Sequence, residues 1–168
     1  VHSILLRPLP YPNSESIMSI FSTWSQNEDS GFSAPNFLDI REQNKSFEAI
    51  SAFGIWGYDV TGDQEPQALT ACRPTYGFFE LLGAKPLYGR TFLREEEIEG
   101  KDQVVILSNA FWKRRFAGDP GIIGKKIMLD GLPFEVVGVM DEKFATPSFV
   151  EIWTPLVFTP EQKQQRGA

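Results

Sequence analysis

The sequence predicts an α+β protein of two lobes, and three observations support this class. Apolar residues make up 42% of the 168 residues and aromatic residues 13%, which is enough for a folded core. Segments with strand and helix periodicity follow one another as β-α-β-β and then as α-β-α-β-β-β. A proline separates the two series, so we place the boundary between the lobes near Arg73-Pro74.

The chain opens with a proline-rich segment and continues into a strand. Pro8, Pro10 and Pro12 fix φ and disfavour helix in the residue before each of them, so the opening is expected to be extended. Apolar residues on both faces predict a strand over 17–24. The polar residues 25–32 predict a loop.

A helix and a hairpin complete the first lobe. Ser33 can cap the helix, Pro35 suits its first turn, and the apolar pattern ends around Asn44. The following hairpin is predicted to have strands 54–61 and 65–73, joined by a turn at Gly62-Asp63.

Two short helices and a buried strand begin the second lobe. Thr75 is a plausible N-cap for an apolar stripe that ends at Gly83. Four apolar residues, 104–107, predict a buried strand. Ser108 then caps a second helix, which Gly118 closes.

The clearest local signal is a hairpin near the end of the second lobe. Strands 126–129 and 132–139 flank Asp130-Gly131, a dipeptide suited to a two-residue type I′ turn. Pro133 cannot donate a ladder hydrogen bond, so this point lies at an edge or at a strand start. A last strand is predicted over 151–156, and the polar tail 162–168 is expected to fray.

The composition argues against catalysis and against metal binding. Cys72 is the single cysteine and His2 the single histidine, which removes a Ser-His-Asp triad, multi-histidine metal sites and cysteine zinc clusters. The acidic run 95–99 has no interleaved aromatic platform, and we interpret it as a solvated loop or first helical turn. We therefore predict no catalytic residue, no cofactor and no metal site, and expect that the chain is not an enzyme.

The charge argues against nucleic acid as a partner. Sixteen basic and 22 acidic residues leave a formal net charge of −6, whereas phosphate binding needs clustered Lys and Arg. The densest basic run is short, Lys113-Arg114-Arg115. The longest apolar runs are also far shorter than the roughly 20 residues of a membrane span. Because the sequence does not begin with Met, we expect it to be a piece of a longer protein.

Several segments, taken together and in order, resemble the MacB-type ABC transporter permeases. The resemblance is to their periplasmic core domain, and within the family to permeases of unassigned substrate called duplicated orphan permeases. The matching segments are LLRPLPYP (5–12), NFLDIREQNKSF (36–47), FFELLG (78–83), GRTF (89–92), residues 108–116, 118–120 and 123–125, DGLPFEVVGVM (130–140) and IWTPL (152–156).

The resemblance implies a two-lobed periplasmic core domain, in which a porter-like β-α-β lobe carries an inserted, sabre-like α/β lobe. On this basis residues 1–12 form a membrane-proximal segment and 13–73 the first half of the porter-like lobe. Residues 74–157 form the sabre-like lobe, and 158–168 begin the return to the porter lobe. The second porter half and the second transmembrane helix are expected after residue 168.

The resemblance also implies a function. The domain is expected to face the periplasm or extracytoplasmic space at a bacterial inner membrane and to relay conformational change during efflux or substrate release. Its expected partners are the permease's own transmembrane helices, a cytoplasmic ATPase domain, a second copy in a homodimer, and a periplasmic adaptor. We interpret Arg7, Pro8, Pro10 and Pro12 as a stiff coupling joint, because prolines transmit a helix displacement that glycines would absorb.

Two other functions stay open at the level of sequence. An extracytoplasmic module that binds a lipid, peptide or sugar would need a groove with exposed aromatic residues. The four tryptophans, Trp24, Trp56, Trp112 and Trp153, lie on four different elements, a distribution that favours the core. A hydrolase would need a converging pair of carboxylates, and the sequence shows no such pair.

Overall fold

The computed structural model describes residues 17, 33–62, 65–144 and 147–163, and the backbone of 22–25 and 28–30. The strands and α-helices are, in chain order, β1 (Ser22–Ser25), β2 (Glu28–Ser30), α1 (Ala34–Gln43), β3 (Phe53–Thr61), β4 (Gln67–Pro74), α2 (Phe78–Leu81), β5 (Pro86–Gly89), β6 (Val104–Leu107), α3 (Asn109–Phe116), β7 (Lys126–Leu129), β8 (Leu132–Met140) and β9 (Ile152–Trp153). Two 3-10 helices, η2 (Arg94–Glu97) and η3 (Pro120–Ile122), lie between them. The predicted α+β class is confirmed.

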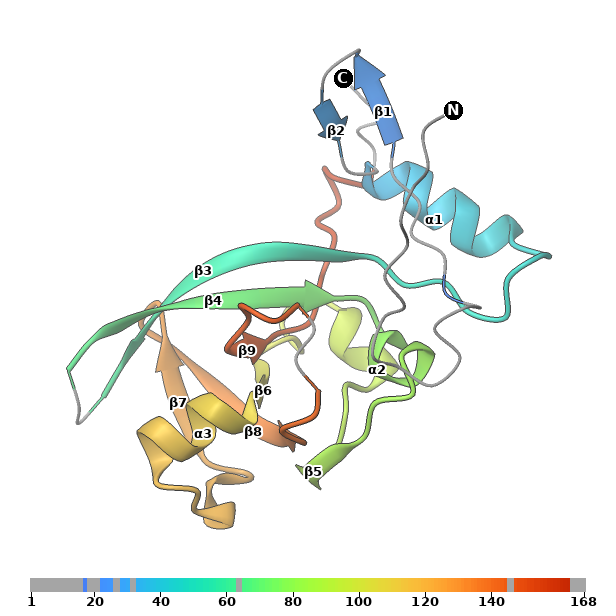
Figure 1. Cartoon of the computed structure of the whole chain (residues 1–168). Coiled ribbons are helices and arrows are strands. Elements are labelled where there is room, and N and C mark those ends of the chain that lie inside the picture. The colour runs from blue at the N-terminus through green and yellow to red at the C-terminus, as the bar shows by residue number, and fades with distance from the viewer. Residues whose placement is uncertain are drawn as a thin grey trace.

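Strands β3 to β9 form one seven-stranded sheet that closes on itself. Its order is β5-β8-β6-β9-β4-β3-β7, and β7 pairs again with β8. The resulting barrel contains every strand of this sheet except β5, which pairs antiparallel with the C-terminal end of β8. Figure 1 shows the barrel in the lower part of the molecule and α1 with the β1–β2 hairpin above it.

Hydrogen bonding runs across the predicted boundary at Arg73-Pro74. β4 pairs in parallel with β9 through Ala71↔Ile152 and Cys72↔Trp153, and β3 pairs with β7. The β3–β4 hairpin, predicted to lie in the first lobe, therefore shares its sheet with the strands of the second. A proline reports local backbone preference, whereas strand partners are selected by burial over the whole sheet. The limits of the lobes themselves stay a prediction.

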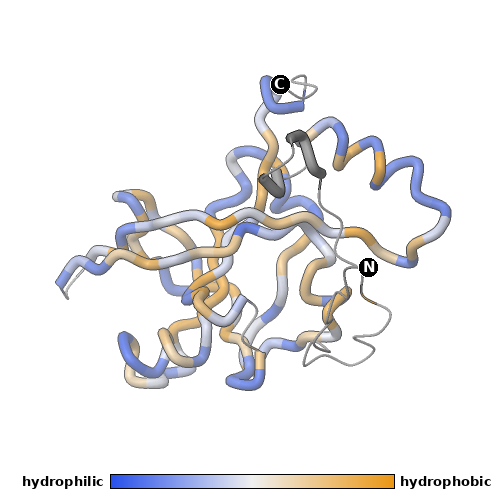
Figure 2. Tube along the Cα trace, turned by 45° about the horizontal axis from the view of Figure 1, so that its top comes forward, coloured by the Kyte–Doolittle hydropathy of each residue, from blue (hydrophilic) through white to orange (hydrophobic). Residues whose placement is uncertain are grey.

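The barrel interior holds the first of two apolar clusters. All six strands of the closed ring contribute to it, and α3 and η3 add residues from outside the sheet. Its members are Tyr58, Val60, Leu69, Ala71, Val105, Leu107, Phe111, Trp112, Ile122, Ile127, Leu129, Phe134, Val136, Val139 and Ile152. Figure 2 shows hydrophobic residues along the central strands and hydrophilic ones on the outer turns.

The second cluster covers the opposite face of β4, β6, β8 and β9. Helix α2 and the loops around Phe92 and Phe144 pack against it. Its members are Cys72, Phe78, Phe79, Leu82, Phe92, Ile106, Val137, Met140, Phe144, Val150 and Trp153. Because both faces of these strands are buried, short runs such as 104–107 are apolar without alternation, as strands with two buried faces are expected to be.

The predicted Asp130-Gly131 turn and Ser108 cap are confirmed. Asp130 and Gly131 have φ values of 49° and 76°, as a type I′ turn requires, and Leu129 pairs with Leu132. The Ser108 hydroxyl accepts a hydrogen bond from the N–H of Phe111 at 3.2 Å. Pro133 lies at the start of β8, before the pairing with β6 begins.

Three local predictions are wrong. The predicted loop 25–32 contains β2, which pairs with β1. Thr75 does not cap α2, because Gly77 occupies the N-cap with a φ of 86°. The third is β5, which was not predicted: it is short and partly exposed, begins at Pro86 and ends at Gly89. Gly89 is required there, because a Cβ would lie 2.1 Å from the carbonyl oxygen of Val137.

The first predicted strand is only partly described. Ser22 to Ser25 form β1, whereas residues 18–21 lie outside the described residues. None of the described helices is long and apolar enough to cross a membrane.

Candidate functional site: the junction between helix α1 and the barrel

Two segments of the chain connect α1 to the barrel. Residues 44–52 lead from α1 into β3, and residues 154–158 leave β9 and run toward α1 (Figure 1). Side chains from distant parts of the sequence hold both segments, and we call this set the junction. Its members are Phe37, Arg41, Ser51, Ala52, Arg73, Thr75, Tyr76, Glu97, Pro155 and Phe158.

Helix α1 contributes one apolar and one charged side chain to the junction. Phe37 is buried, and its ring centroid lies 5.9 Å from that of Phe158. Arg41, one turn later, places its guanidinium 5.2 Å from the centre of the Phe37 ring. The side chains are neighbours because residues four apart lie on one helix face. Ser33 occupies the predicted N-cap, but its hydroxyl makes no capping bond.

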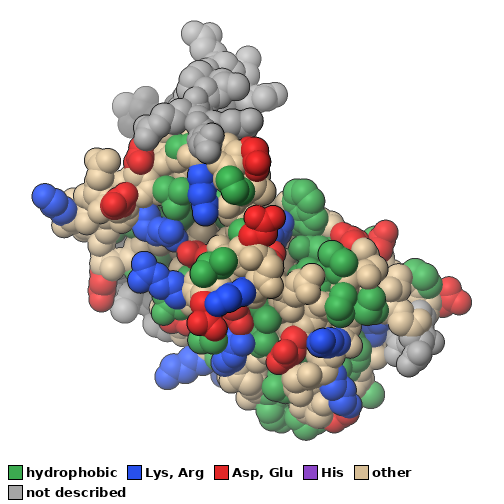
Figure 3. Space-filling view, turned by 180° about the vertical axis from the view of Figure 1, so that it is seen from behind, with side chains coloured by type: hydrophobic (Ala, Val, Ile, Leu, Met, Phe, Trp, Pro, Cys, Tyr) green, Lys and Arg blue, Asp and Glu red, His purple; other side chains and the backbone are tan. Residues whose placement is uncertain are grey.

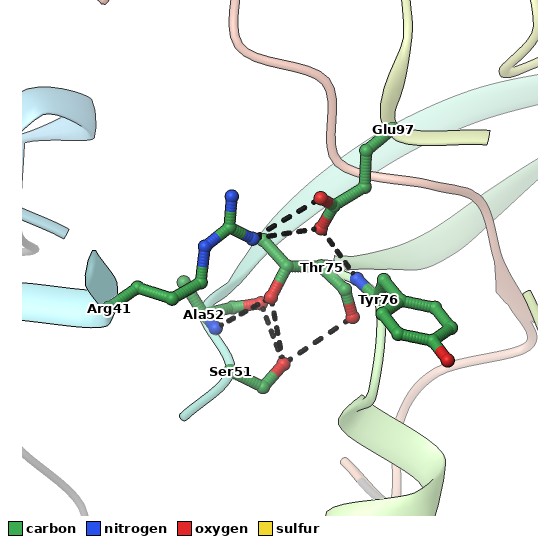
Figure 4. A network of polar contacts seen from close by, with 6 residues as sticks. All are labelled: Arg41, Ser51, Ala52, Thr75, Tyr76 and Glu97. Atoms are coloured by element: carbon green, nitrogen blue, oxygen red, sulfur yellow. Dashed lines mark hydrogen bonds and ion pairs between the residues drawn. The ribbon is translucent and has the colours of Figure 1, made fainter. Parts of the chain in front are cut away.

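Thr75 joins the first connecting segment to the end of β4. The side chain is 1% exposed, and its Oγ1 accepts a hydrogen bond from the N–H of Ala52 at 3.0 Å. The Ser51 and Thr75 hydroxyls lie 2.9 Å apart, and the Thr75 N–H donates to the Ala52 carbonyl at 2.8 Å (Figure 4). A buried hydroxyl with these partners holds the chain firmly where it enters β3.

Glu97 links α1 to the loop before α2. Its carboxylate accepts hydrogen bonds from Arg41 Nη1, at 3.2 Å to one oxygen and 3.3 Å to the other, and from the N–H of Tyr76 at 2.7 Å (Figure 4). Both charged side chains keep some exposure to solvent, so their attraction is partly screened. The bridge nevertheless connects residues 56 positions apart in sequence.

Arg73 holds the second connecting segment. Its Nε and Nη2 both donate to the carbonyl of Pro155, at 3.2 Å and 3.0 Å. The guanidinium also lies over the ring of Trp56, 5.8 Å from its centroid. The N–H of Leu156 donates to the Pro74 carbonyl at 2.9 Å, so residues 154–156 extend the pairing of β9 beside β4.

The acidic run 95–99 begins in the helical turn η2, which is one of the two alternatives that the sequence offers, but it is not wholly solvated. Glu96 is 5% exposed and pairs with Arg90, with an oxygen 2.7 Å from Nη2, and also accepts from the N–H of Leu93 at 2.7 Å. The hydrogen bond to Glu96 raises the pKa of Arg90 above its ordinary value. Glu97 belongs to the junction, so two of these carboxylates are structural.

The residues predicted to form the coupling joint, Arg7, Pro8, Pro10 and Pro12, lie outside the described residues, and so does His2. Cys72 is fully buried in the second apolar cluster, and burial raises the pKa of its thiol to about 12. In residues 33–62, 65–144 and 147–163, no group of three His, Cys, Asp or Glu could hold a metal ion.

The described tryptophans differ in burial, and charges of both signs are mixed on the surface. Trp112 and Trp153 are buried in the two clusters, whereas Trp56 is exposed on β3. On the face shown in Figure 3, Lys and Arg side chains are interspersed with Asp and Glu, and hydrophobic side chains gather between them. The arrangement can hold two parts of a chain in a fixed orientation, and the junction is where it does so.

Sequence reasoning missed the junction, although one part of it could have been found. The pairing of Phe53 with Pro74 places Ala52 opposite Thr75, one step beyond the hairpin. The predicted strands 54–61 and 65–73 start and end two residues from Ala52 and Thr75, so the predicted hairpin already places these two near its open end. The bridge between Arg41 and Glu97 leaves no such signal, because its two ends share no local element.

The fold is similar to that of known proteins. Two solved structures show the likeness. The extracellular domain of the noncanonic ABC-type transporter YknZ from Gram-positive bacteria has a TM-score of 0.60 at 20% identity, with 74% of this chain and 62% of that chain covered. The periplasmic region of MacB from Actinobacillus actinomycetemcomitans has a TM-score of 0.61 at 16% identity, with 74% and 55% covered.

The chain belongs to the MacB-like periplasmic core domain family, whose model matches residues 7–167. The macrolide export ATP-binding/permease protein MacB of Escherichia coli K12 is 28% identical over 81 residues, which are 46% of this chain and 12% of that protein. The chain thus aligns with about an eighth of the length of the curated relatives it matches. The resemblance predicted from the ordered segments is confirmed, and a role in transport follows from the family.

Proposed function

We propose that the domain relays conformational change between the membrane and the extracytoplasmic space, with the junction as its stiff element. In this proposal the domain is part of a permease in a bacterial inner membrane, faces the periplasm or extracytoplasmic space, and carries out no chemistry. A cytoplasmic ATPase drives the transmembrane helices, and their movement reaches the barrel through α1 during efflux or substrate release. A second copy and a periplasmic adaptor complete the proposed assembly.

The observation that carries the proposal is that both connecting segments are held by side chains. A relay must transmit displacement, and a flexible connection would absorb it. Thr75 and Glu97 hold the first segment and its helix, and Arg73 holds the second. Two separate attachments resist rotation of α1 against the barrel better than either alone. With one attachment α1 could still turn about that point, and the second attachment prevents this rotation.

Charge reversal in the full transporter tests this relay. Spin labels on Glu42→Cys in α1 and Leu132→Cys at the barrel turn report the distance between the two parts by double electron–electron resonance. We expect a narrow distribution that is unchanged by ATP and vanadate. Arg41→Glu should broaden it, and Arg41→Glu combined with Glu97→Arg should narrow it again.

The matched control is the exposed ion pair between Lys113 and Glu142, on the barrel and away from the junction. Lys113→Glu should leave the distribution and the ATPase rate unchanged. If α1 and the barrel instead change their separation with nucleotide in the unsubstituted transporter, they move independently and the relay proposal is wrong.

The coupling joint gives a second test. Replacing Pro8, Pro10 and Pro12 with glycine in the full transporter should reduce transport while ATP hydrolysis continues. Erythromycin efflux is a suitable first probe because several relatives are named macrolide exporters, and its transport by the unsubstituted protein must be shown first. Transport that is unchanged by the three substitutions would refute the coupling joint.

A further inference from the structure

Strand β3 has one open edge in the part of the chain that the structure describes. β4 pairs with residues 53–60 on one side, whereas β7 reaches only Val60 and Thr61 on the other. At Asp59 the edge is closed by the turn at Asp130. The Asp59 N–H donates to the Asp130 carboxylate, and the Asp59 carbonyl accepts from the Asp130 N–H. Residues 53–57 therefore have β4 on one side and no described strand on the side that β7 occupies farther along.

The backbone groups of alternate residues point out from this edge. Asp59 directs both its N–H and its carbonyl toward β7, and Ala52 directs its carbonyl toward the chain after β4. Strand alternation then places the N–H and carbonyl of Phe53, Ile55 and Gly57 on the open side. An edge of this kind accepts an additional strand unless charge, proline or a bulge prevents it, and none of these occurs between residues 53 and 57.

The side chains along this edge are unusually apolar for exposed positions. Phe53, Ile55 and Trp56 are 53%, 47% and 55% exposed. Gly54 and Gly57 are the other two residues of this segment, and a Cβ at either glycine would meet no atom within 4 Å. Glycine inside a strand weakens it and often marks a place where another backbone or a large side chain comes close.

We propose that this edge pairs antiparallel with the same edge of a second copy, centred on Ile55. In that register Ile55 lies opposite its own copy, Phe53 opposite Gly57, and Trp56 opposite Gly54. Each aromatic side chain thus faces a glycine, which has space above it, while the Phe53 ring also packs against Phe78 and the Arg73 guanidinium lies over the Trp56 ring. The three residues with outward backbone groups exchange their hydrogen bonds with the same three residues of the other copy.

A second copy suits this edge better than a different partner because the five residues are self-complementary about a two-fold axis. Isologous contacts need this property, since residue i of one copy contacts residue j of the other and residue j contacts residue i in return. The segment carries no charge, so two copies do not repel along it despite the net charge of −6. The proposal concerns the barrel edge alone and does not depend on the relay.

Complementary charges at the centre of the register provide the test, with the 168-residue chain studied by sedimentation velocity over a concentration series. Ile55→Lys alone and Ile55→Glu alone each place like charges directly opposite and should weaken the dimer at least about tenfold. An equimolar mixture of the two variants should restore a dimer that contains one of each. Circular dichroism checks that both variants are folded.

A cross-link sets the register independently. Cys72 lies directly opposite Ile55 on β4, so the cross-link is tested in a Cys72→Ala background, in which Ile55→Cys is the one cysteine of the sequence. Under mild oxidation it should form a disulfide dimer, because opposite Cα atoms lie about 5.5 Å apart in such a pair. Phe149→Cys in the same background, at a position that is also exposed but lies in the loop before β9, is the control and should not cross-link.

The outcomes decide between the possible occupants of the edge. A chain that is monomeric at all concentrations, with Ile55→Cys uncross-linked, shows that something other than a second copy covers the edge, and the proposal is wrong. Dimers that persist in both charge variants, or single variants that weaken the dimer without rescue on mixing, place the contact elsewhere and also overturn it. None of these results bears on the junction.

Discussion

The barrel and the junction are held together by different kinds of interaction. In the barrel, large apolar side chains such as Trp153 and Phe111 are fully buried, and strand pairing closes the sheet around them. In the junction, hydrogen bonds and one part-exposed ion pair position α1, with a single aromatic contact between Phe37 and Phe158. Burial of apolar area provides most folding free energy, whereas polar bonds contribute less but are directional.

Because of this difference, the junction can be altered without unfolding the domain, whereas the barrel cannot. Changes in the barrel should lower the free energy of unfolding by several kcal/mol. Changes in the junction should alter the orientation of α1 and leave the barrel folded. A connection of this kind suits a relay, because its geometry is fixed by few bonds and can be changed by few substitutions.

The largest effect is expected from Trp153→Ala. Trp153 is fully buried against Phe79 and Phe144, with ring centroids 5.9 and 5.5 Å away. Removal of a large buried aromatic side chain should lower the free energy of unfolding by about 3–5 kcal/mol, measured by denaturant titration. Trp56→Ala, on the exposed tryptophan, should cost less than about 1 kcal/mol. Equal losses at the two positions would contradict the distinction between core and surface.

A smaller effect is expected from Thr75→Val in the junction. The substitution keeps the shape of the side chain but removes the acceptor for the Ala52 N–H and the partner of Ser51. Unpaired buried groups should cost about 1–3 kcal/mol, and hydrogen exchange at the Ala52 amide should accelerate.

The control for this prediction is Thr75→Ser, which retains the hydroxyl and should keep most of the protection. Combining Thr75→Val with Ser51→Ala should cost less than the sum of the two single changes, because both remove the same bond. Full additivity would show that the two hydroxyls are not coupled.

Arg41→Ala should have less effect on stability than either of these. The ion pair with Glu97 is part-exposed, so its contribution to the free energy of unfolding should be below about 1 kcal/mol and should fall further in high salt. Its effect on the position of α1 should nevertheless be measurable as a chemical-shift change at the Tyr76 amide, which Glu97 also binds. A loss of several kcal/mol would place the junction among the core interactions.

Cys72 should make the free energy of unfolding depend on pH, but only at alkaline pH. Burial raises the pKa of its thiol from 9.0 to about 12, so between these values the unfolded chain loses a proton that the folded chain keeps. Stability should therefore be unaffected below pH 9 and should decline as the pH rises toward 12. Denaturation of Cys72→Ala beside the unsubstituted chain isolates this contribution, and parallel pH profiles of the two would contradict it.

Local chemistry explains which parts of the fold were predictable. Asp130-Gly131 specifies its turn because its φ values suit few other dipeptides, and Ser108 specifies a helix start through a bond to Phe111 three residues later. β5 escaped prediction because its pairing with β8, and not its own apolar pattern, makes it a strand. The role of Thr75 was misjudged because a buried threonine and an N-cap look alike until the hairpin register is known.

The α+β class, most of the helices and strands, and the family could be predicted from the 168 residues alone, because each depends on periodicity, turn chemistry or short ordered segments. The closed barrel that joins the β3–β4 hairpin to the later strands could not, and neither could the contact between Glu97 and Arg41 across 56 positions. The physical reason is that strand partners and ion pairs between distant residues are selected by burial and geometry summed over the whole fold. No local stretch of sequence contains that sum.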